Sequence, residues 1–341
     1  MAHRVKRKAG KKIISKLGNG FALSTILFAL CLPAQAQQRP KVARIGILRV
    51  DARTSPVATE AIDDLKRGLS DLGYVEGQNI QFEIRRAENK LDRLPILAAE
   101  LVQLKIDVIV TSGPQAIKAT KEATNTIPIV MGRMDDVVEH GLVKSLARPG
   151  GNLTGLSFQT GELSGKWLDL LREALPKLSR VAVLWDTSST AGQLKTVEEA
   201  ARSTGLHLAV SKVAGLQDFD LVFDGFRKER AGGLVILASP IFTAQRARLA
   251  ELAAKQNLAA IYYHEGFTQA GGLLAYGPTQ SEFSWHRAAI FIDKILKGAK
   301  PADLPVEQPT KFDFIINIKT AKQIGVPIPP NVLARADRVI R

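Results

Sequence analysis

Residues 105–120 read KIDVIVTSGPQAIKAT, and the order of residue types in this stretch decides the fold class. The run DVIV is mostly β-branched and apolar, which predicts a strand buried on both faces. The sequence TSGP ends that strand, and the proline stands at the start of a helical pattern. A buried strand that turns directly into a helix is the repeating unit of a parallel α/β sheet.

The same alternation of short apolar runs and amphipathic stretches continues from residue 41 onward. In the first half it predicts strands at 42–48, 79–88, 107–113 and 127–136, with helices at about 59–72, 91–105 and 114–124. In the second half RVAVLWD (180–186), GGLVILASP (232–240) and LAAIYYHEG (258–266) return in the same order, offset by about 130 residues. The sequence therefore predicts an α/β protein with two Rossmann-like lobes, each built on a parallel sheet.

Three stretches rich in turn-forming residues lie where the chain would pass between the lobes: 145–160, 273–279 and 308–317. The expected division is a first lobe of residues 42–155 plus about 277–311, and a second lobe of 156–276 plus about 312–341. The three passages form a three-strand hinge that can absorb closure of the lobes. Open α/β sheets bind ligands beyond the carboxyl ends of their strands, so the expected site is the cleft between the lobes.

The formal net charge of +14 suggests nucleic-acid binding, but half of this charge lies in the first 16 residues. Residues 1–36 contain no Asp or Glu, and the basic start is followed by FALSTILFALCLP and then AQA. These are the parts of a cleavable secretory signal peptide, with cleavage after Ala36, and they predict export to the periplasm. A membrane anchor is the alternative, but the apolar run of about a dozen residues is shorter than the ~20 that span a bilayer.

The only cysteine, Cys31, lies within this leader. The residue before it, Leu30, is not the small residue that precedes a lipid-modified cysteine, so a lipoprotein is the weaker interpretation. A mature chain without cysteine has no disulfide, no thiol nucleophile and no Cys-ligated metal.

Motifs for catalysis, cofactors and nucleic acid are missing from the sequence. It has no G-x-S-x-G, no G-x-G-x-x-G after the first strand and no H-E-x-x-H, and its five histidines are scattered. The stretch GELSGKW is one residue short of a phosphate loop and has Trp167 where Ser or Thr is required. No helix-turn-helix or aromatic–basic pattern appears. We therefore expect no enzyme, no cofactor, no metal and no nucleic-acid partner, although a catalytic pair such as Asp136 and Glu265 stays open.

Several phrases resemble the substrate-binding proteins of ABC transporters, and more narrowly the family that includes tryptophan- and aromatic-amino-acid-binding members. They are LGYVEGQNI (72–80), LARPGGN (146–152) and KGAKPADLPVEQPTKF (297–312), within a likeness that runs from about Val42 to Arg338. The resemblance implies a type I periplasmic binding protein fold that closes without catalysis around a small ligand. It also implies an ABC permease and ATPase in the inner membrane as partners, and we expect a monomer.

The expected function is therefore the periplasmic binding component of an importer for a small organic ligand, an amino acid or another carboxylate-bearing metabolite. An exported ligand sensor for a membrane receptor fits the same sequence, and an exported enzyme on this scaffold is the more distant alternative. Similar proteins commonly read GDPV where this chain reads MDDVVEHG, which keeps Asp136 but differs at Val137, Glu139 and His140. Ligand identity therefore does not carry over from the resemblance.

The first set of candidate ligand-binding residues surrounds the turn in the opening stretch. It consists of Thr111, Ser112, Gly113, Gln115 and Ala116, where free N–H groups and the positive end of a helix suit a carboxylate. Plain capping of the helix by Ser112 is the alternative. Asp136 is predicted to accept a hydrogen bond from an ammonium group of the ligand, and a role as a turn residue is equally open for it. Asp135 is the second choice for the same contact.

The second set comes from the corresponding places in the second half. It consists of Trp185, Asp186, Ser239, Tyr263 and Glu265, of which Ser239 matches Ser112, while Tyr263 and Glu265 match Asp136. The ring of Trp185 either stacks on the ligand or belongs to the core. Weaker candidates are Pro240, Phe158, Arg49 and Asp51, the last two of which either touch the ligand or pair with each other.

Overall fold

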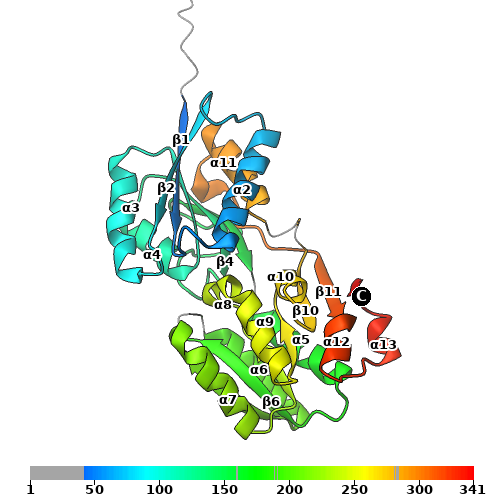
Figure 1. Ribbon diagram of the computed structural model, residues 1–341. Helices are drawn as coiled ribbons and strands as arrows, with labels where there is room; N and C mark the ends of the chain where they lie inside the picture. The colour runs from blue at the N-terminus through cyan, green and yellow to red at the C-terminus, as the bar shows by residue number, and fades with distance from the viewer. Residues whose placement is uncertain (1–41, 159, 188, 190, 280, 282–283) are drawn as a thin grey trace, which may run out of the picture. The chain divides into compact units, whose positions relative to one another are not determined.

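The computed structural model describes residues 42–341 except 159, 188, 190, 280 and 282–283 (Figure 1). The predicted signal peptide, its cleavage point and Cys31 lie outside the described residues. Two β-sheets organise the rest of the chain. Among the described residues, each helix is too short or too polar to cross a lipid bilayer.

The first sheet has five parallel strands in the order β2-β1-β3-β4-β5. Its strands are β1 (Ala43–Arg49), β2 (Ile80–Arg86), β3 (Val108–Ser112), β4 (Ile129–Asp135) and β5 (Leu153–Phe158). The helices that follow the strands are α2 (Pro56–Asp71), η1 (Leu91–Arg93), α3 (Leu94–Gln103) and α4 (Pro114–Ala123). The opening stretch of the sequence is thus β3, a sharp turn and α4, as its residue types predict.

The second sheet has seven strands in the order β12-β11-β10-β9-β8-β6-β7. Its strands are β6 (Arg180–Asp186), β7 (His207–Val213), β8 (Gly233–Ile236), β9 (Ala259–Tyr262), β10 (Leu274–Pro278), β11 (Phe312–Asn317) and β12 (Arg338–Ile340). Its helices are α5 (Thr160–Ala174), α6 (Ala191–Thr204), η2 (Leu216–Asp218), α7 (Phe219–Lys228), α8 (Pro240–Ala244), α9 (Arg246–Lys255), α10 (Glu265–Gln269), α12 (Ile318–Gln323) and α13 (Pro330–Leu333).

The two sheets repeat one strand order. Read from β7 to β10, the second sheet runs β7-β6-β8-β9-β10, which corresponds strand for strand to β2-β1-β3-β4-β5 of the first sheet. The expected α/β class and the repeated topology are confirmed. The second sheet is not wholly parallel, because β11 pairs antiparallel with β10. The chain leaves β10 for α11 (Trp285–Leu296) and η3 (Pro301–Asp303) and re-enters the sheet from the opposite direction.

The chain passes between the sheets after β5, after β10 and before β11. The predicted boundary between residues 155 and 156 lies inside β5, whose whole length pairs with β4 of the first sheet. The return before β11 runs beside β5, where the Ser157 N–H donates to the carbonyl of Glu307 and the Glu307 N–H donates to that of Gly155. We retain the two-lobe division as a proposal, with β5, β10 and β11 leading into the three passages.

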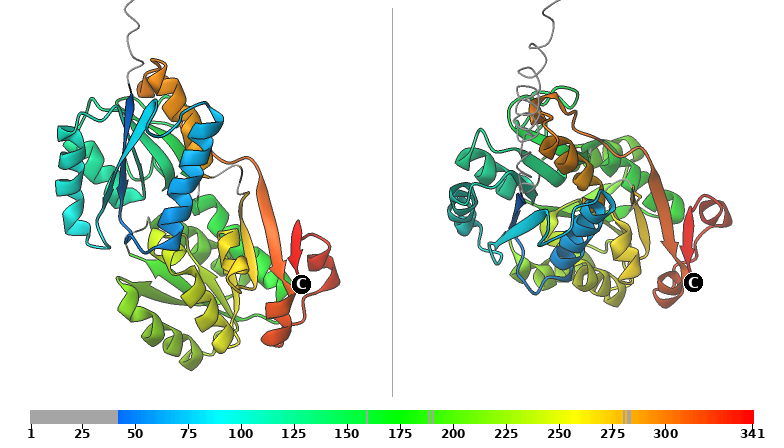
Figure 2. Two further views of the ribbon diagram at one scale, coloured as in Figure 1. Left: turned by 45° about the horizontal axis from the view of Figure 1, so that its top comes forward. Right: turned by 90° about the horizontal axis from the view of Figure 1, so that it is seen from above.

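Apolar packing covers both faces of the first sheet. Helices α3 and α4 pack on one face, where Leu101 and Ile106 meet Gly46 of β1. Helix α11, more than 200 residues further along the chain, lies beside α2 on the other face (Figure 2). The two helices approach so closely that a Cβ on Gly68 of α2 would stand 2.4 Å from the carbonyl oxygen of His286. The buried side chains of Trp285 and Phe291 complete that layer.

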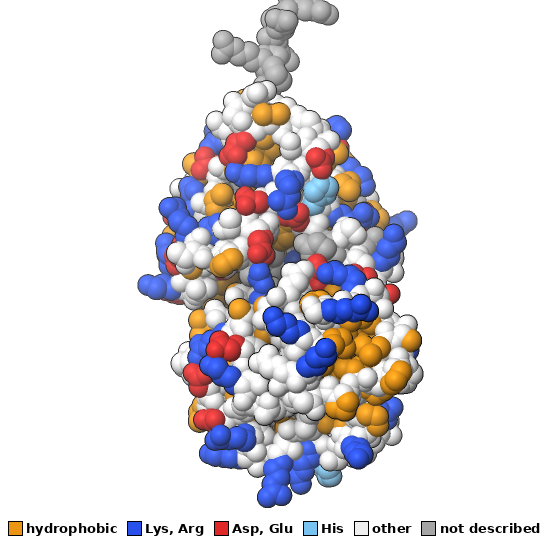
Figure 3. All heavy atoms as spheres, turned by 45° about the vertical axis from the view of Figure 1, so that its right-hand side comes forward, with side chains coloured by type: hydrophobic (Ala, Val, Ile, Leu, Met, Phe, Trp, Pro, Cys, Tyr) orange, Lys and Arg blue, Asp and Glu red, His pale blue; other side chains and the backbone are white. Residues whose placement is uncertain are grey.

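Basic side chains do not gather into a stripe on the face drawn in Figure 3. Asp and Glu lie among the Lys and Arg side chains in the upper part of this face, while several Lys and Arg side chains lie near its middle beside a patch of hydrophobic side chains.

Candidate ligand-binding site

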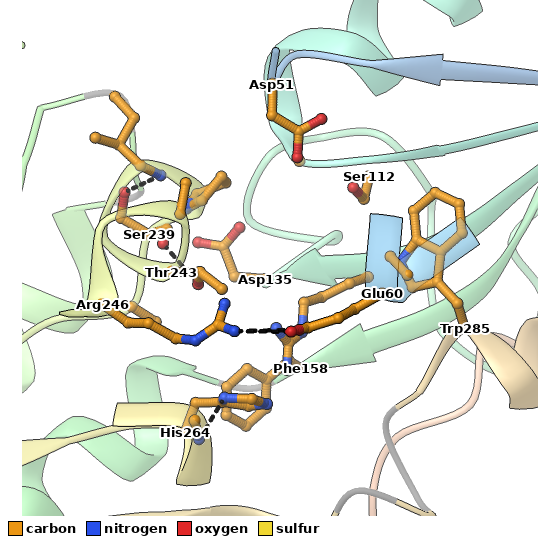
Figure 4. Close-up of a pocket in the computed structure, with 18 of the residues that line it drawn as sticks. Asp51, Glu60, Ser112, Asp135, Phe158, Ser239, Thr243, Arg246, His264 and Trp285 are labelled. Atoms are coloured by element: carbon orange, nitrogen blue, oxygen red, sulfur yellow. Dashed lines mark hydrogen bonds and ion pairs between the residues drawn. The ribbon is translucent and has the colours of Figure 1, made fainter. Parts of the chain in front are cut away.

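A cavity of about 500 Å³ lies at the carboxyl ends of strands from both sheets (Figure 4). Its lining includes Ser112 and Asp135 from the ends of β3 and β4, and Ser239 and Tyr263 from the turns after β8 and β9. Cavities of roughly 300–1,000 Å³ with a few polar groups are typical of sites for small molecules. The fold therefore forms a pocket where the sequence predicts one.

On the first-sheet side of this cavity, Arg49 at the end of β1 is the centre of a buried polar group. Its Nε and Nη2 atoms donate to the two carboxylate oxygens of Asp51 at 3.0 and 2.5 Å. Its Nη1 atom donates to Ser112 Oγ at 3.0 Å, and its guanidinium lies 4.8 Å from the ring centre of Trp285. Of the two roles considered for Arg49 and Asp51, they adopt the mutual pair, while both still line the cavity.

On the second-sheet side, Ser239 and Tyr263 are held by the protein itself. Ser239 Oγ accepts from the Ile241 N–H at 3.1 Å, which caps the short helix α8, and donates to Asp186 Oδ2 at 2.5 Å. The Tyr263 hydroxyl donates to the Ser239 carbonyl at 2.7 Å and lies 2.6 Å from Thr243 Oγ1. Burial raises the pKa of Tyr263 to about 12, so this phenol stays neutral.

His264 also lines this side and caps α10. Its Nδ1 atom accepts from the Gly266 N–H at 3.0 Å. Burial lowers the pKa of His264 well below its ordinary value, and nearby Arg133 and Arg246 lower it further. The imidazole is therefore a neutral wall of the cavity at physiological pH.

Strand β4 carries a bulge that turns two charged side chains into the cavity. Against β3, Thr111 pairs with Met131 and Ser112 with Arg133, so Gly132 is an extra residue. A bulge of this kind re-aims the side chains that follow it. Arg133 and Asp135 both line the cavity, and burial lowers the pKa of Arg133. Burial raises the pKa of Asp135 to about 7, assisted by the charge of Asp136.

Asp136 does not line the cavity, contrary to its predicted place among the ligand-binding residues. Its Oδ2 atom accepts from Thr160 Oγ1 at 2.7 Å and from the Gly161 N–H at 3.2 Å, so it caps α5. Its backbone has φ +38°, an unusual conformation for a residue with a Cβ. The turn role left open for Asp136 is the one that the structure shows, and Asp135 occupies the cavity instead.

Five other predicted residues also fall outside the cavity lining: Thr111, Gln115, Ala116, Trp185 and Asp186. Thr111 is buried and its hydroxyl donates to the Leu48 carbonyl at 3.0 Å, while Ala116 belongs to the core. Trp185 packs against the core with Lys212 Nζ 5.7 Å from its ring centre. Asp186 is buried and accepts a hydrogen bond from Ser239 Oγ. The remaining predicted residues, Ser112, Gly113, Ser239, Tyr263 and Glu265, line the cavity.

Two further pairs of charges border the cavity. Arg246 of α9 donates to Glu60 of α2 at 3.0 Å, which links helices that belong to different sheets. The carboxylate of Glu265 pairs with Arg338 of β12. Both Glu60 and Arg246 lie inside helices, where no sequence pattern distinguished them from solvated surface residues.

Across residues 42–341, the six undescribed positions aside, no group of three or more His, Cys, Asp or Glu side chains could hold a metal ion. The cavity instead combines guanidinium, carboxylate, hydroxyl and aromatic groups, a set suited to a polar organic molecule.

Comparisons with known proteins agree with this fold. A family model described as ABC transporter substrate binding protein matches residues 47–340. A tyrosine-binding protein of Clostridioides difficile (strain R20291) is 27% identical over 285 residues, which is 78% of this chain and 78% of that protein.

Two solved structures are similar over almost all of the described chain. The ABC domain of Streptococcus pneumoniae in complex with L-Trp has a TM-score of 0.78 at 24% identity and covers 87% of this chain and 99% of its own. A conserved domain protein of Vibrio cholerae has a TM-score of 0.80 at 24% identity and covers 88% of this chain and 100% of its own. These likenesses confirm the expected type I periplasmic binding protein fold. Because the family model spans nearly the whole described chain, the protein belongs to the ABC transporter substrate-binding proteins.

Proposed function

We propose that this chain is the binding component of an ABC importer and holds an amino acid in the cavity between its sheets without transforming it. The observation that carries the proposal is the pair of opposite charges on β4, Arg133 and Asp135, both of which line the cavity. Side chains two residues apart on a strand share a face. An α-amino acid carries its carboxylate and ammonium groups close together, so such a pair is complementary to it.

Other charges around the cavity also form pairs. The pairs are Arg49 with Asp51, Arg67 with Asp64, Arg246 with Glu60, and Arg338 with Glu265. A lining that is balanced overall but polar along β4 favours a zwitterion over a ligand of high net charge. The names of the relatives, one tyrosine-binding and one solved with L-Trp, support the same class. We propose that Ser112, Gly113, Arg133, Asp135 and Tyr263 contact the ligand.

The cellular role follows from the family and the leader. We propose that residues 1–36 direct the chain to the periplasm and are removed there, and that the mature monomer delivers its ligand to a permease and ATPase. Ligand binding would favour closure of the two lobes to the extent that the ligand prefers the closed state.

Binding of an amino acid is expected to raise the thermal stability of the chain lacking residues 1–36. A ligand at about 100 times its dissociation constant stabilises the folded state by ~2.7 kcal/mol, which a thermal-shift screen detects. The screen would compare amino acids with sugars, nucleosides and carboxylates that lack an amino group. Recovery of the ligand unchanged after incubation would distinguish binding from catalysis. A stabilising sugar or nucleoside with no effect of any amino acid would contradict the proposed ligand class.

Affinity for the amino acid is expected to rise with pH. The charges of Asp136, Glu139 and Asp186 act on Asp135, and the imidazole of His140, whose pKa burial lowers, lies 3.8 Å from its carboxylate. Because the pKa of Asp135 is raised to about 7, the free protein holds a proton there at lower pH that an ammonium group must displace. Affinity should therefore fall by up to about tenfold per unit below pH 7. Calorimetry between about pH 5 and 8 would test this. The control is Asp135→Asn, whose affinity should not change with pH in this range.

A further inference from the structure

Two serines occupy matching places in the repeated topology, Ser112 at the end of β3 and Ser239 just after β8. Each lines the cavity. A serine hydroxyl has one hydrogen to donate and two lone pairs with which to accept. The acceptor to which each hydroxyl donates its hydrogen therefore decides whether it can also donate to a ligand.

Ser239 donates its hydrogen to another group of the protein. Its Oγ atom donates to Asp186 Oδ2 at 2.5 Å and accepts from the Ile241 N–H at 3.1 Å. Asp186 is buried, and a carboxylate can only accept unless it is protonated. Ser239 is therefore committed to capping α8 and has no hydrogen for the cavity.

Ser112 is in the opposite position because its polar neighbour is a guanidinium. Arg49 Nη1 donates to Ser112 Oγ at 3.0 Å, and a guanidinium has no acceptor. The hydroxyl must therefore accept from Arg49 and direct its own hydrogen elsewhere. Arg49 cannot easily turn away, since Asp51 holds its other edge through two hydrogen bonds and the Trp285 ring lies against it. Figure 4 shows Asp51, Ser112 and Trp285 around this point.

The charges near Ser112 favour an anion as the acceptor. Two guanidiniums, Arg49 and Arg86, surround the single carboxylate of Asp51 at 2.5 and 3.9 Å. Helix α4 begins beside Ser112, and the N–H groups of its first turn have no acceptor within the helix. An ammonium group that used the remaining lone pair of Ser112 would face this positive field, whereas a carboxylate oxygen would be stabilised by it.

We propose that Asp51 and Arg49 position the Ser112 hydroxyl as a hydrogen-bond donor to the carboxylate of the ligand, and that Ser239 has no such role. Arg49 is a positioning residue that acts through Ser112, and Asp51 orients Arg49. This inference rests on the proposed binding function and specifies that the carboxylate of the ligand lies beside Ser112 at the end of β3. The ammonium group then lies toward Asp135.

We call the chain from Asp51 through Arg49 to Ser112 the relay. Calorimetry with L-tyrosine and L-tryptophan and with their primary amides tests it, since the amides remove the carboxylate charge and keep the shape of the ligand. Ser112→Ala is expected to weaken binding of the acid by ~10–100-fold and of the amide by a few-fold, because hydrogen bonds to charged groups are the stronger. Ser112→Thr keeps a hydroxyl and should keep the preference for the acid. Ser239→Ala should change the affinity for acid and amide equally.

Arg49→Lys keeps the charge but loses the fork that serves Asp51 and Ser112 together. It should reduce the acid-over-amide preference in the wild-type background and have no further effect on it in Ser112→Ala. An equal loss for acid and amide in Ser112→Ala, or an undiminished effect of Arg49→Lys in that variant, would overturn the relay alone. Failure of the wild-type protein to bind any of the four probes would overturn the relay, and the wider screen would then decide the proposed function separately.

Discussion

Replacing Trp167 with alanine is expected to lower the free energy of unfolding by ~3–5 kcal/mol, the range for deleting a fully buried aromatic side chain. Trp167 lies on α5, is completely buried and packs between that helix and the second sheet. Its Nε1 atom donates to the Tyr276 carbonyl of β10 at 2.7 Å. The substitution therefore leaves a cavity and also removes the donor from a carbonyl group of the sheet.

Urea or thermal unfolding of the variant measures this loss, and Trp167→Phe is the matched control. Phenylalanine keeps most of the apolar volume and deletes the Nε1 donor, so its loss should be the smaller. The Trp167 ring centre is 6.1 Å from that of Tyr263, which lines the cavity. Weaker ligand binding should accompany the loss of stability. A loss below about 1 kcal/mol for the alanine variant would show that the second sheet does not depend on this packing.

Removing the carboxylate of Asp51 is expected to be about as costly, ~3–5 kcal/mol, because it leaves a buried charge without its partner. The side chains of Arg49 and Asp51 are only 8% and 12% exposed. In Asp51→Ala, the guanidiniums of Arg49 and Arg86 would face each other without the carboxylate between them. The free energy of unfolding, measured in urea with and without salt, would report the effect.

Two controls separate burial from pairing as the cause. Glu251→Ala breaks an ion pair with Lys255 whose side chains are 62% and 66% exposed, and it should cost less than ~1 kcal/mol. Arg49→Met combined with Asp51→Leu replaces both charges with apolar groups and should recover most of the stability lost in Asp51→Ala. If Asp51→Ala proved no worse than Glu251→Ala, the Arg49 group would have to be solvated rather than buried.

The fold is readable from the sequence because periodicity and turn chemistry agree in nearly every unit. The run DVIVTSGPQA contains a buried strand, a glycine at φ +80° and a proline at the first helical position. All three features agree with one strand–turn–helix unit. The repeated order of such units predicts the matching strand orders of the two sheets. The antiparallel direction of β11 could not be predicted from the sequence, because it depends on where α11 packs and not on the local residue pattern.

The site is only partly readable because a strand end gives a location but not a direction. Ser112, Ser239 and Tyr263 were found through their places after buried strands. Asp135 and Asp136 exchange roles because the bulge at Gly132 shifts the alternation of β4 by one residue. Glycine is suited to that position because a Cβ there would stand 2.5 Å from the Trp285 ring. Trp285 itself reaches the cavity from more than 150 residues further along the chain, which no local signal reveals.

The packing of α11 on α2 separates the order of synthesis from the order of folding. All five strands of the first sheet have been made by Phe158, yet the helix that covers their second face is not made until residues 285–296. Helix α2 is made earlier, but until α11 follows, a growing chain lacks the cover over β3, β4 and β5, where Val110 and Val130 are later buried. Contacts between such distant segments slow folding and leave apolar surface open to other chains. The two lobes therefore cannot mature one after the other, and a nascent chain needs protection from aggregation until α11 is in place.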